Sequence, residues 1–294
     1  MSYETIEYTV EDGVATVTLS RPEKMNALST RMVREVVEVC DQIDGDDAVR
    51  AVIFTGAGKA FCAGADISGG AGDFLTDGEN AVVRPDGTYN YADEAARDGG
   101  GRMTLRLFRV TKPIIAAING AAVGVGSTMT LPMDIRIAAQ SARFGFVFAR
   151  RGIVPEAASS WFLPRVVGIS KALEWCYSGR VFGSEEALSG GLVSRVVPDE
   201  DLLSIARSIA REIADNTAPV SIALTRQMMW RGLGMSDPME AHRVDSRAIV
   251  ARSLSADAAE GVTSFFEKRP AKFPMTVSEN MPDFYPWWEE TEYR

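Results

Sequence analysis

The sequence is poor in cysteine and histidine, which limits the chemistry open to it. Of 294 residues, three are cysteine and one is histidine. Cys40, Cys62 and Cys176 are isolated, odd in number and lack Cys-x-x-Cys spacing, which favours a reducing compartment over a secreted scaffold or a zinc site. With His242 as the single histidine, we expect no metal, and a Ser-His-Asp triad would depend on that residue alone.

Excess basic charge and long apolar runs are also lacking. The formal net charge is −9, which argues against general nucleic-acid binding, because a phosphate backbone is normally met by clustered Lys and Arg. No apolar run approaches the ~18 residues of a membrane span, and the N-terminus carries acid where a signal peptide carries base. We expect a cytoplasmic protein that binds neither nucleic acid nor membranes, and an anionic ligand would need a local basic pocket.

The composition that remains is that of an ordinary globular protein, with 46% hydrophobic and 24% charged residues. Residues 5–10 and 14–19 alternate apolar and polar side chains around Glu11-Asp12-Gly13, which predicts a β-hairpin. A helix is expected to begin at Ser29 or Thr30. Short apolar strands that end in glycine turns, at 51–54 and 114–118, indicate an α/β core.

The second half of the chain is predicted to be mainly helical. Its helical patterns cover Asp199–Ile213, Val220–Trp230, Pro238–Leu254 and Ala256–Glu267. We expect residues 1–215 to form the core and residues 216–294 a C-terminal helical region, with a hinge at Asn216–Pro219. Within the core, residues 68–101 read as a variable insertion, either a lid or a disordered flap, that is partly helical at Tyr91–Ala96.

Three stretches resemble the enoyl-CoA hydratase/isomerase (crotonase) superfamily and occur in the order and at the spacing of that family. They are Arg21-Pro22-Glu23-Lys24-Met25-Asn26-Ala27-Leu28, Phe54-Thr55-Gly56 through Phe61-Cys62-Ala63-Gly64-Ala65-Asp66-Ile67, and Asn119-Gly120-Ala121-Ala122-Val123-Gly124-Val125-Gly126. The resemblance implies a spiral of ββα turns that forms two roughly perpendicular sheets, followed by a helical region that packs in a homotrimer or homohexamer. It also implies an acyl-CoA thioester substrate, with coenzyme A as part of the substrate and no prosthetic group.

The glycine-flanked segments suit the stabilisation of an enolate. A thioester enolate carries negative charge on one oxygen, and preorganised N–H donors in a dry site stabilise that charge. Small residues such as Gly64 and Gly124 let the backbone approach a ligand closely. The resemblance implies that the N–H groups of Ala63 and Val125 form this oxyanion hole. The alternative is that these glycines serve only tight turns and close helix packing.

The same resemblance implies a set of coenzyme A contacts. They come from the loop around Lys24, Met25 and Ala27, from Ala63, Gly64, Ala65, Asp66 and Ile67, from Gly124, and from Lys268 in the closing helix of the same or an adjacent subunit. Lys24 and Lys268 would meet phosphate groups. An ordinary solvated lysine is the alternative for the first, and a cationic helix C-terminus for the second.

The type of reaction depends on which carboxylates are present. Where hydratases of this family carry two glutamates, this sequence has Thr128 and Phe148, so the usual two-glutamate hydration is doubtful. The segment Val154-Pro155-Glu156-Ala157-Ala158-Ser159-Ser160 resembles the enoyl-CoA isomerase branch, which makes Glu156 the candidate proton shuttle for converting a 3-enoyl-CoA into a 2-enoyl-CoA. An apolar pocket would raise the glutamate pKa towards a useful range, and the side chains expected to supply it are Phe144, Phe146, Phe148, Trp161 and Phe162.

Two alternatives to the isomerase remain open. One is a hydratase that works through a different carboxylate. The other is an acyl-CoA-binding protein that has lost catalysis.

Overall fold

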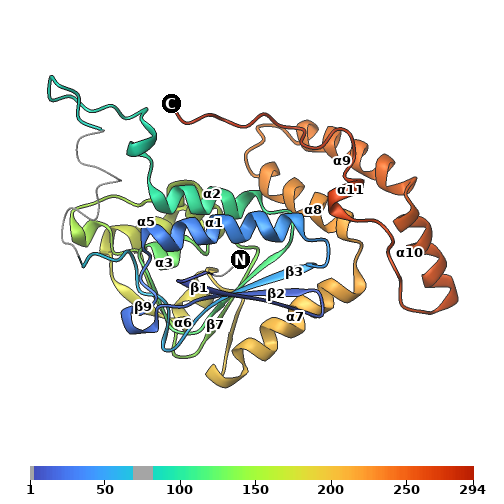
Figure 1. The fold of residues 1–294 in the computed structure, drawn as a ribbon, viewed down its shortest axis with the longest axis horizontal. Coiled ribbons are helices and arrows are strands. Elements are labelled where there is room, and N and C mark those ends of the chain that lie inside the picture. Colours follow the sequence, from blue (N-terminus) through green and yellow to red (C-terminus); the bar gives the residue numbers. More distant parts are fainter. Residues whose placement is uncertain (1–2, 69–81) are drawn as a thin grey trace.

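The computed structural model describes residues 3–68 and 82–294, and it is built on two sheets (Figure 1). The larger sheet has the strand order β1 (Ile6–Glu11), β2 (Val14–Leu19), β3 (Ala51–Gly56), β5 (Ile114–Ile118), β7 (Ile135–Ala139) and β10 (Arg195–Val197). The smaller sheet has the order β4 (Ala60–Cys62), β6 (Ala121–Val123), β8 (Arg143–Gly145) and β9 (Val181–Gly183). Neighbouring strands are parallel except at the β1–β2 and β8–β9 pairs.

Successive strand pairs alternate between the sheets, which produces the predicted spiral. β3, β5 and β7 lie side by side in the larger sheet, and the strands that follow them, β4, β6 and β8, lie side by side in the smaller one. Each ββα unit therefore adds one strand to each sheet. As a result, the turns that follow β4 and β6 are brought together at one place.

The helices of the core are α1 (Thr30–Gly45), α2 (Gly99–Arg109), α3 (Val125–Thr128), α4 (Ser159–Val167), α5 (Ile169–Ser178), α6 (Ser184–Ser189) and α7 (Leu202–Asn216). Ser29 is the N-cap of α1, and its side chain accepts a hydrogen bond from the Met32 N–H, so the helix begins where the sequence predicted. The C-terminal helices are α8 (Pro219–Gly232), α9 (Pro238–Ser253), α10 (Ala256–Glu267) and α11 (Val277–Asn280). None of the helices in 3–68 and 82–294 is both long and apolar enough to span a bilayer.

The predicted insertion at 68–101 needs correction where the structure describes it. The helical segment expected at Tyr91–Ala96 is a single 3-10 turn, η3 (Glu94–Ala96). The insertion also ends earlier, because α2 starts at Gly99, where the Asp98 carboxylate accepts the N–H groups of Gly100 and Gly101. Residues 69–81 of the expected insertion lie outside the described residues.

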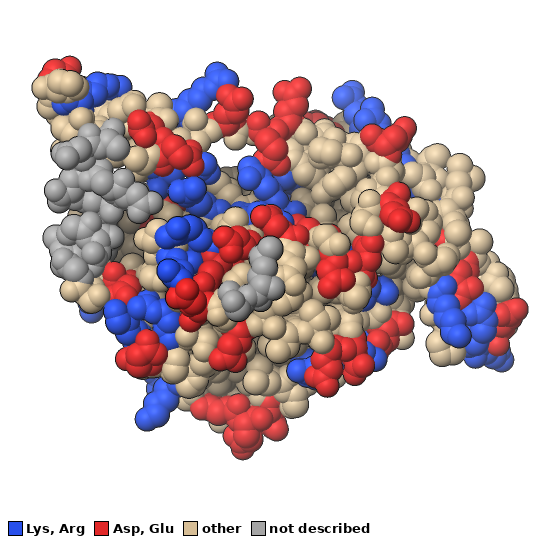
Figure 2. Space-filling view, viewed as in Figure 1, with Lys and Arg blue, Asp and Glu red and all other residues tan. Residues whose placement is uncertain are grey.

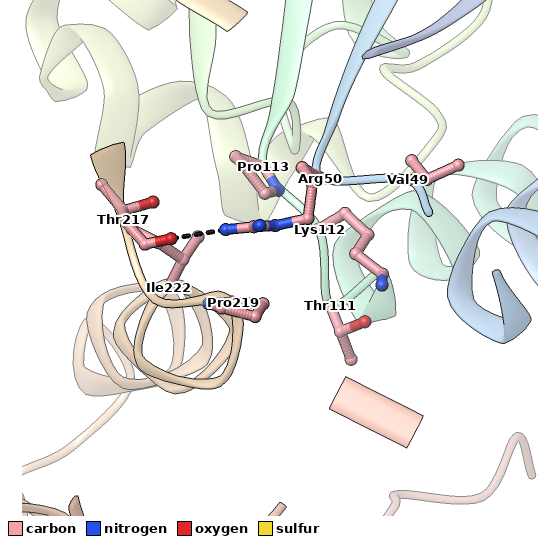
Figure 3. A pocket seen from close by; sticks show the side chains of 8 residues that line it. All are labelled: Val49, Arg50, Thr111, Lys112, Pro113, Thr217, Pro219 and Ile222. Carbon is pink, nitrogen blue, oxygen red and sulfur yellow. Dashed lines mark hydrogen bonds between the residues drawn. The ribbon is translucent and has the colours of Figure 1, made fainter. Parts of the chain in front are cut away.

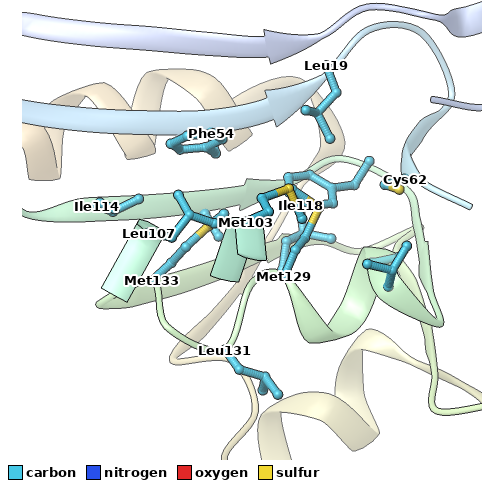
Figure 4. Packing of buried hydrophobic residues seen from close by; sticks show 14 of the residues in the cluster. Leu19, Phe54, Cys62, Met103, Leu107, Ile114, Ile118, Met129, Leu131 and Met133 are labelled. Atoms are coloured by element: carbon cyan, nitrogen blue, oxygen red, sulfur yellow. The ribbon is translucent and has the colours of Figure 1, made fainter. Parts of the chain in front are cut away.

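The central strands β3 and β5 of the larger sheet are buried on both faces, as their continuous apolar sequences require. On one face, Phe54, Ile114 and Ile118 pack with Met103 and Leu107 of α2, as Figure 4 shows. On the other, Ile53, Ile115 and Ile137 pack against α7 through Leu202, Ala206 and Ala210. The first of these two cores supports the floor of the site.

The segment after α7 is tied to the core at its first residues (Figure 3). The Arg50 guanidinium donates a hydrogen bond to the Thr217 carbonyl oxygen, next to a small cavity that Lys112 and Pro219 also line. This contact joins the start of β3 to the predicted hinge between α7 and α8.

Arg226 of α8 provides a stronger link to the core. Its guanidinium donates to Asp134 Oδ2 at 2.8 Å and to the carbonyl oxygens of Leu107, Phe108 and Val110, where α2 ends. The Arg226 side chain is only 3% exposed. A single buried cation therefore satisfies the last carbonyls of α2 and pairs with a carboxylate of the core.

The C-terminal tail, residues 281–294, returns across the molecule towards η3 (Figure 1). Glu290 pairs with Arg109 of α2 at 2.6 Å and with Arg231 of α8 at 3.4 Å. Further on, the Tyr293 hydroxyl donates to the Tyr91 carbonyl oxygen at 2.9 Å. The tail therefore bridges α8, α2 and the segment before η3.

Replacing Arg226 with Ala is expected to lower the free energy of unfolding by roughly 3–5 kcal/mol, because it leaves the half-buried Asp134 carboxylate and the helix carbonyls without their cationic partner. Urea denaturation measures the change. The matched control is Arg207→Ala, which removes an exposed ion pair with Glu11 and should cost less than about 1 kcal/mol. Equal effects of the two substitutions would contradict the role assigned to Arg226.

Candidate active site

Two glycine-containing turns meet at the ends of β4 and β6, which pair in parallel. A Cβ atom at Gly126 would stand 1.9 Å from the Cys62 carbonyl oxygen, so this close approach requires glycine. Gly124 has φ 56° and ψ −124°, and Gly64 has φ 124°, conformations that other residues rarely adopt. These glycines bring the N-terminus of α3 against the segment 62–64.

Of the two amides predicted to form the oxyanion hole, only one is placed for that role. Val125 is the first residue of α3, where an N–H has no acceptor within the helix. The Ala63 N–H, in contrast, donates to the Met25 carbonyl oxygen at 3.0 Å. The assignment of the Ala63 N–H as an oxyanion donor is therefore wrong, because that hydrogen is already bonded within the protein.

Ala65 offers an alternative N–H donor in the same segment. Leu28 forms a parallel bridge with Ala65, in which the Leu28 N–H donates to Gly64 O and the Leu28 carbonyl accepts from Asp66 N. Successive N–H groups of an extended chain point to opposite sides, so the Ala65 N–H points away from Leu28. Ala65 also lines the cavity described below.

The loop expected to contact coenzyme A is held by a buried amide. The Asn26 side chain is fully buried and donates to the carbonyl oxygens of Ala57 and Ala60 at 2.9 and 2.7 Å. Asn26 and Met25 both have positive φ, which the side-chain bonds of Asn26 support. The resulting turn lies against segment 62–66, because the Met25 carbonyl oxygen binds the Ala63 N–H.

Asp66 organises the basic residues of that loop. Its Oδ2 accepts from Arg21 Nη2 at 2.8 Å and from Lys24 Nζ at 3.0 Å. Arg21, together with Ser68 and Lys24, holds the pKa of Asp66 well below its usual range. The same Arg21 also donates to the Ala27 carbonyl oxygen at 2.6 Å. Asp66 therefore positions Lys24, whose side chain is 45% exposed, and its contact with phosphate stays a prediction.

A cavity of about 1240 Å³ opens at the two turns and continues between α1 and α2. Several of the predicted site residues line it, namely Ala63, Gly64, Ala65, Ile67, Gly124, Val125 and Glu156. Its described walls also carry six arginines, Arg34, Arg97, Arg102, Arg106, Arg109 and Arg151, against four carboxylates, Glu38, Glu94, Asp98 and Glu156. Figure 2 shows both basic and acidic groups around a hollow on this face. Arg97, Arg106 and Arg109 are themselves paired with carboxylates.

Glu156 projects into the inner end of this cavity from a strained turn. The two residues after it, Ala157 and Ala158, both have positive φ, 58° and 52°. Left-handed conformations in consecutive non-glycine residues are uncommon and concentrate at functional sites. The Thr128 hydroxyl, on α3, donates to Glu156 Oε1 at 2.7 Å. The carboxyl group therefore lies beside the helix whose first amide is that of Val125.

Burial raises the pKa of Glu156 from its ordinary 4.5 to about 8, and the nearby Asp98 carboxylate adds to the rise. The Thr128 hydrogen bond acts in the opposite direction, because it favours the charged form. A group with this pKa both accepts and releases a proton near neutral pH, which suits general acid–base chemistry.

Sequence reasoning missed two residues of the site, Asp98 and Gly100. Both residues fall in the segment predicted as an insertion. A helix can nevertheless begin with glycines when an aspartate caps it. A signal was present in the Asp98-Gly99-Gly100-Gly101 pattern, since aspartate is a preferred N-cap. Of the aromatic side chains expected around Glu156, Phe148 lines the cavity, whereas Phe146 stacks on Trp175 in the core.

Lys268 lies away from this cavity. It is the exposed C-cap of α10, which is at the far end of the molecule from α3 (Figure 1). Within one subunit the structure therefore does not bring Lys268 to the other predicted coenzyme A contacts. A contribution from an adjacent subunit stays a prediction.

Comparison with known proteins agrees with this geometry. A model of the enoyl-CoA hydratase/isomerase family matches residues 9–275. Enoyl-CoA hydratase ACTT3 of Alternaria alternata is 42% identical over 269 residues, covering 91% of this chain and 85% of that protein. The 1,2-epoxyphenylacetyl-CoA isomerase of Escherichia coli (strain K12) is 33% identical over 271 residues, covering 90% and 96%.

The crystal structure of an enoyl-CoA hydratase from Bacillus anthracis is also similar, with a TM-score of 0.80 and 32% identity over 92% of this chain and 99% of that one. The fold and the site thus define an acyl-CoA enzyme with the crotonase architecture. Among such enzymes, this chain belongs to the enoyl-CoA hydratase/isomerase family. The resemblance seen in the sequence is confirmed.

The contact between the two turns predicts the effect of a methyl group. Gly126→Ala is expected to lower the free energy of unfolding by about 1–3 kcal/mol or more, because the new Cβ meets the Cys62 carbonyl oxygen. Thermal unfolding measures the loss. Gly232→Ala, at the end of α8 with no atom within 4 Å of the added Cβ, is the control and should be close to neutral. If both variants unfold at the same temperature as the wild type, the two turns are not in contact.

Proposed function

We propose that this protein isomerises 3-enoyl-CoA to 2-enoyl-CoA. The observation that carries the proposal is the Glu156 carboxyl group, which lies in the cavity beside α3 and has its pKa raised to about 8. An isomerase needs one group that removes a proton and returns it elsewhere. The similarity to an isomerase of Escherichia coli supports the choice within the family.

In the proposed reaction, the thioester oxygen accepts hydrogen bonds from the N–H groups of Val125 and Ala65. The Glu156 carboxylate takes a proton from C2, and the electron pair of that C–H bond moves towards the thioester to form a dienolate. The protonated Glu156 then gives its proton to C4, which leaves the double bond between C2 and C3. Each amide of such an oxyanion hole typically contributes on the order of 10²–10³ in rate.

A hydratase is the second candidate, because relatives such as the Alternaria alternata and Bacillus anthracis proteins bear that name. Hydration needs a group that activates water and a group that protonates C2. Glu156 and Asp98 supply two carboxyl groups on the same cavity wall. Incubation with 2-enoyl-CoA in ¹⁸O-labelled water distinguishes the candidates, since rapid incorporation of the label at C3 favours hydration.

The pH dependence of isomerisation tests the role of Glu156. As a base, Glu156 acts in its deprotonated form, so kcat/KM with a 3-enoyl-CoA should rise with pH and level off above about 8. Glu156→Gln should lose roughly 10²–10⁴ of the rate. The same variant should be more stable than the wild type at pH 9 and equally stable near pH 4, because charging the buried Glu156 is unfavourable. Unchanged turnover in Glu156→Gln would exclude this mechanism.

We also propose that the chain assembles into a homotrimer or homohexamer through its C-terminal helical region. The helices α9 and α10 expose apolar side chains that a soluble surface does not require, including Val250, Leu254, Phe265 and Phe266 at 60%, 85%, 77% and 77% exposure. Such an assembly would also allow Lys268 of one subunit to approach the cavity of another.

Light scattering coupled to size exclusion tests the assembly. The expected mass is about three or six times that of the 31.9 kDa chain. Phe265→Asp with Phe266→Asp should shift the mass towards a single chain, whereas Leu203→Asp, a substitution at an exposed leucine of α7, should leave it unchanged. A wild-type mass of one chain at all concentrations would refute the proposed assembly.

A further inference from the structure

Asp98 makes more hydrogen bonds than the cap of a helix needs. Its Oδ1 accepts from the Gly100 N–H at 2.9 Å and its Oδ2 from the Gly101 N–H at 2.8 Å, which caps α2. A third bond, from the Ala157 N–H to Oδ2 at 2.6 Å, comes from a segment 59 residues further along the chain. One carboxylate therefore joins the start of α2 to the residue next to Glu156.

The turn that carries Glu156 is held from α2 on both sides of Ala157. Besides the N–H bond to Asp98, the Ala157 carbonyl oxygen accepts from the Thr104 hydroxyl at 3.0 Å. Ala157 is fully buried and has a left-handed backbone conformation, which is unfavourable for a residue with a Cβ atom. These two bonds from α2 therefore hold the conformation that points Glu156 into the cavity.

The carboxyl groups of Asp98 and Glu156 also lie together above Gly100. A Cβ atom at Gly100 would stand 2.2 Å from Glu156 Oε2 and 3.3 Å from Asp98 Oδ1, so only glycine leaves room for both. The Asp98 carboxylate contributes to the raised pKa of Glu156, because a nearby negative charge disfavours the charged form of Glu156. The Asp98 side chain thus binds the main chain next to the proton shuttle and lies close to the Glu156 carboxyl group.

We propose that Asp98 is the positioning residue of the proton shuttle: it fixes the turn that carries Glu156 and presents a negative charge to the Glu156 carboxyl group. This inference rests on the proposed function for its catalytic consequence. The structural part, the coupling of Asp98 to Glu156, stands on the hydrogen bonds and on the space above Gly100.

The other groups that face Glu156 do not replace this charge. Thr128 of α3 donates a hydrogen bond that favours the carboxylate, and the Cys62 thiol at the end of β4 is neutral, because burial raises its pKa to about 11. Arg151 of η4 (Ala149–Arg151) and Arg97 and Arg102 line the wider cavity. Among the residues that the structure describes, Asp98 is the anion in contact with Glu156. Its charge favours protonated Glu156 and so makes it a stronger base.

The first test measures the proton affinity of Glu156 without turnover. The pKa of Glu156 is higher in the folded protein than in the unfolded chain, so the wild type should lose stability relative to Glu156→Gln as pH rises from 4.5 to about 8. In an Asp98→Asn background the pKa of Glu156 should be lower, because a like charge has been removed. The loss of stability should then be complete about one or more pH units lower than in the Asp98 protein. Denaturant titrations from pH 4 to 10 supply the data.

The second test uses catalysis. With a 3-enoyl-CoA, Asp98→Asn should move the rising limb of kcat/KM to lower pH by the same amount. It should also lower kcat about tenfold to a hundredfold, the loss expected when a catalytic group is displaced by ~1 Å, with a smaller change in KM. Asp98→Ser keeps a cap for α2, but its side chain neither reaches Ala157 nor carries charge. It should therefore show the same changes as Asp98→Asn, and it replaces that variant if Asp98→Asn does not fold.

Asp237→Asn is the matched control, because Asp237 caps α9 through the Met239 N–H at 2.7 Å and lies outside the cavity. It should leave both pH profiles unchanged. If Asp98→Asn lowers stability by the same amount at every pH and leaves the profile of kcat/KM in place, Asp98 is an ordinary helix cap and the inference is wrong. If the wild type fails to isomerise 3-enoyl-CoA but the stability profile still moves, the proposed function fails and the coupling of Asp98 to Glu156 stands.

Discussion

The backbone of the β6–α3 turn lies against the carbonyl oxygen of Cys62, with no room for a side chain between them. Gly126 makes this contact possible, and the unusual backbone angles of Gly64 and Gly124 direct the chain on either side of it. Two short parallel strands, β4 and β6, fix the distance between the turns. The first amide of α3, the Ala65 amide and the inner end of the cavity all take their places from this contact, so the chemistry depends on a packing constraint between two segments of main chain.

The carboxyl group of the site is placed by a second constraint, which comes from α2. Glu156 stands on a loop whose left-handed residues are held by Asp98 and Thr104 and whose side chain needs the space that Gly100 leaves open. A loop alone would position a carboxyl group poorly. Here the main chain is bonded to a helix that is itself anchored at its far end by Arg226. Arg226, the helix α2 and the bonds from Asp98 and Thr104 therefore link α8 to the turn that carries the reactive group.

Much of this arrangement could be predicted from the sequence because it depends on local signals. The hairpin, the Ser29 cap, the strand at 114–118 and α10 have the predicted positions, since alternation, caps and apolar runs act within a few residues. The glycine motifs identified the two turns, and the segment Val154–Ser160 identified Glu156. The choice of Ala63 over Ala65 as a donor was wrong, because which amide is already bonded depends on Met25, nearly forty residues earlier. Asp98 and Gly100 were missed because their partners, Glu156 and Ala157, are distant in sequence.

The position of the C-terminal tail affects where a tag can be attached to the protein. It lies entirely beyond residues 9–275, the part that matches the family. Its Tyr293 ring nevertheless packs under the guanidinium of Arg97, a residue of the cavity wall, at 5.1 Å. Any affinity tag or fluorescent fusion attached after Arg294 would therefore emerge beside the wall of this cavity. The N-terminal strand β1, at the edge of the larger sheet, is the safer point of attachment for purification or labelling.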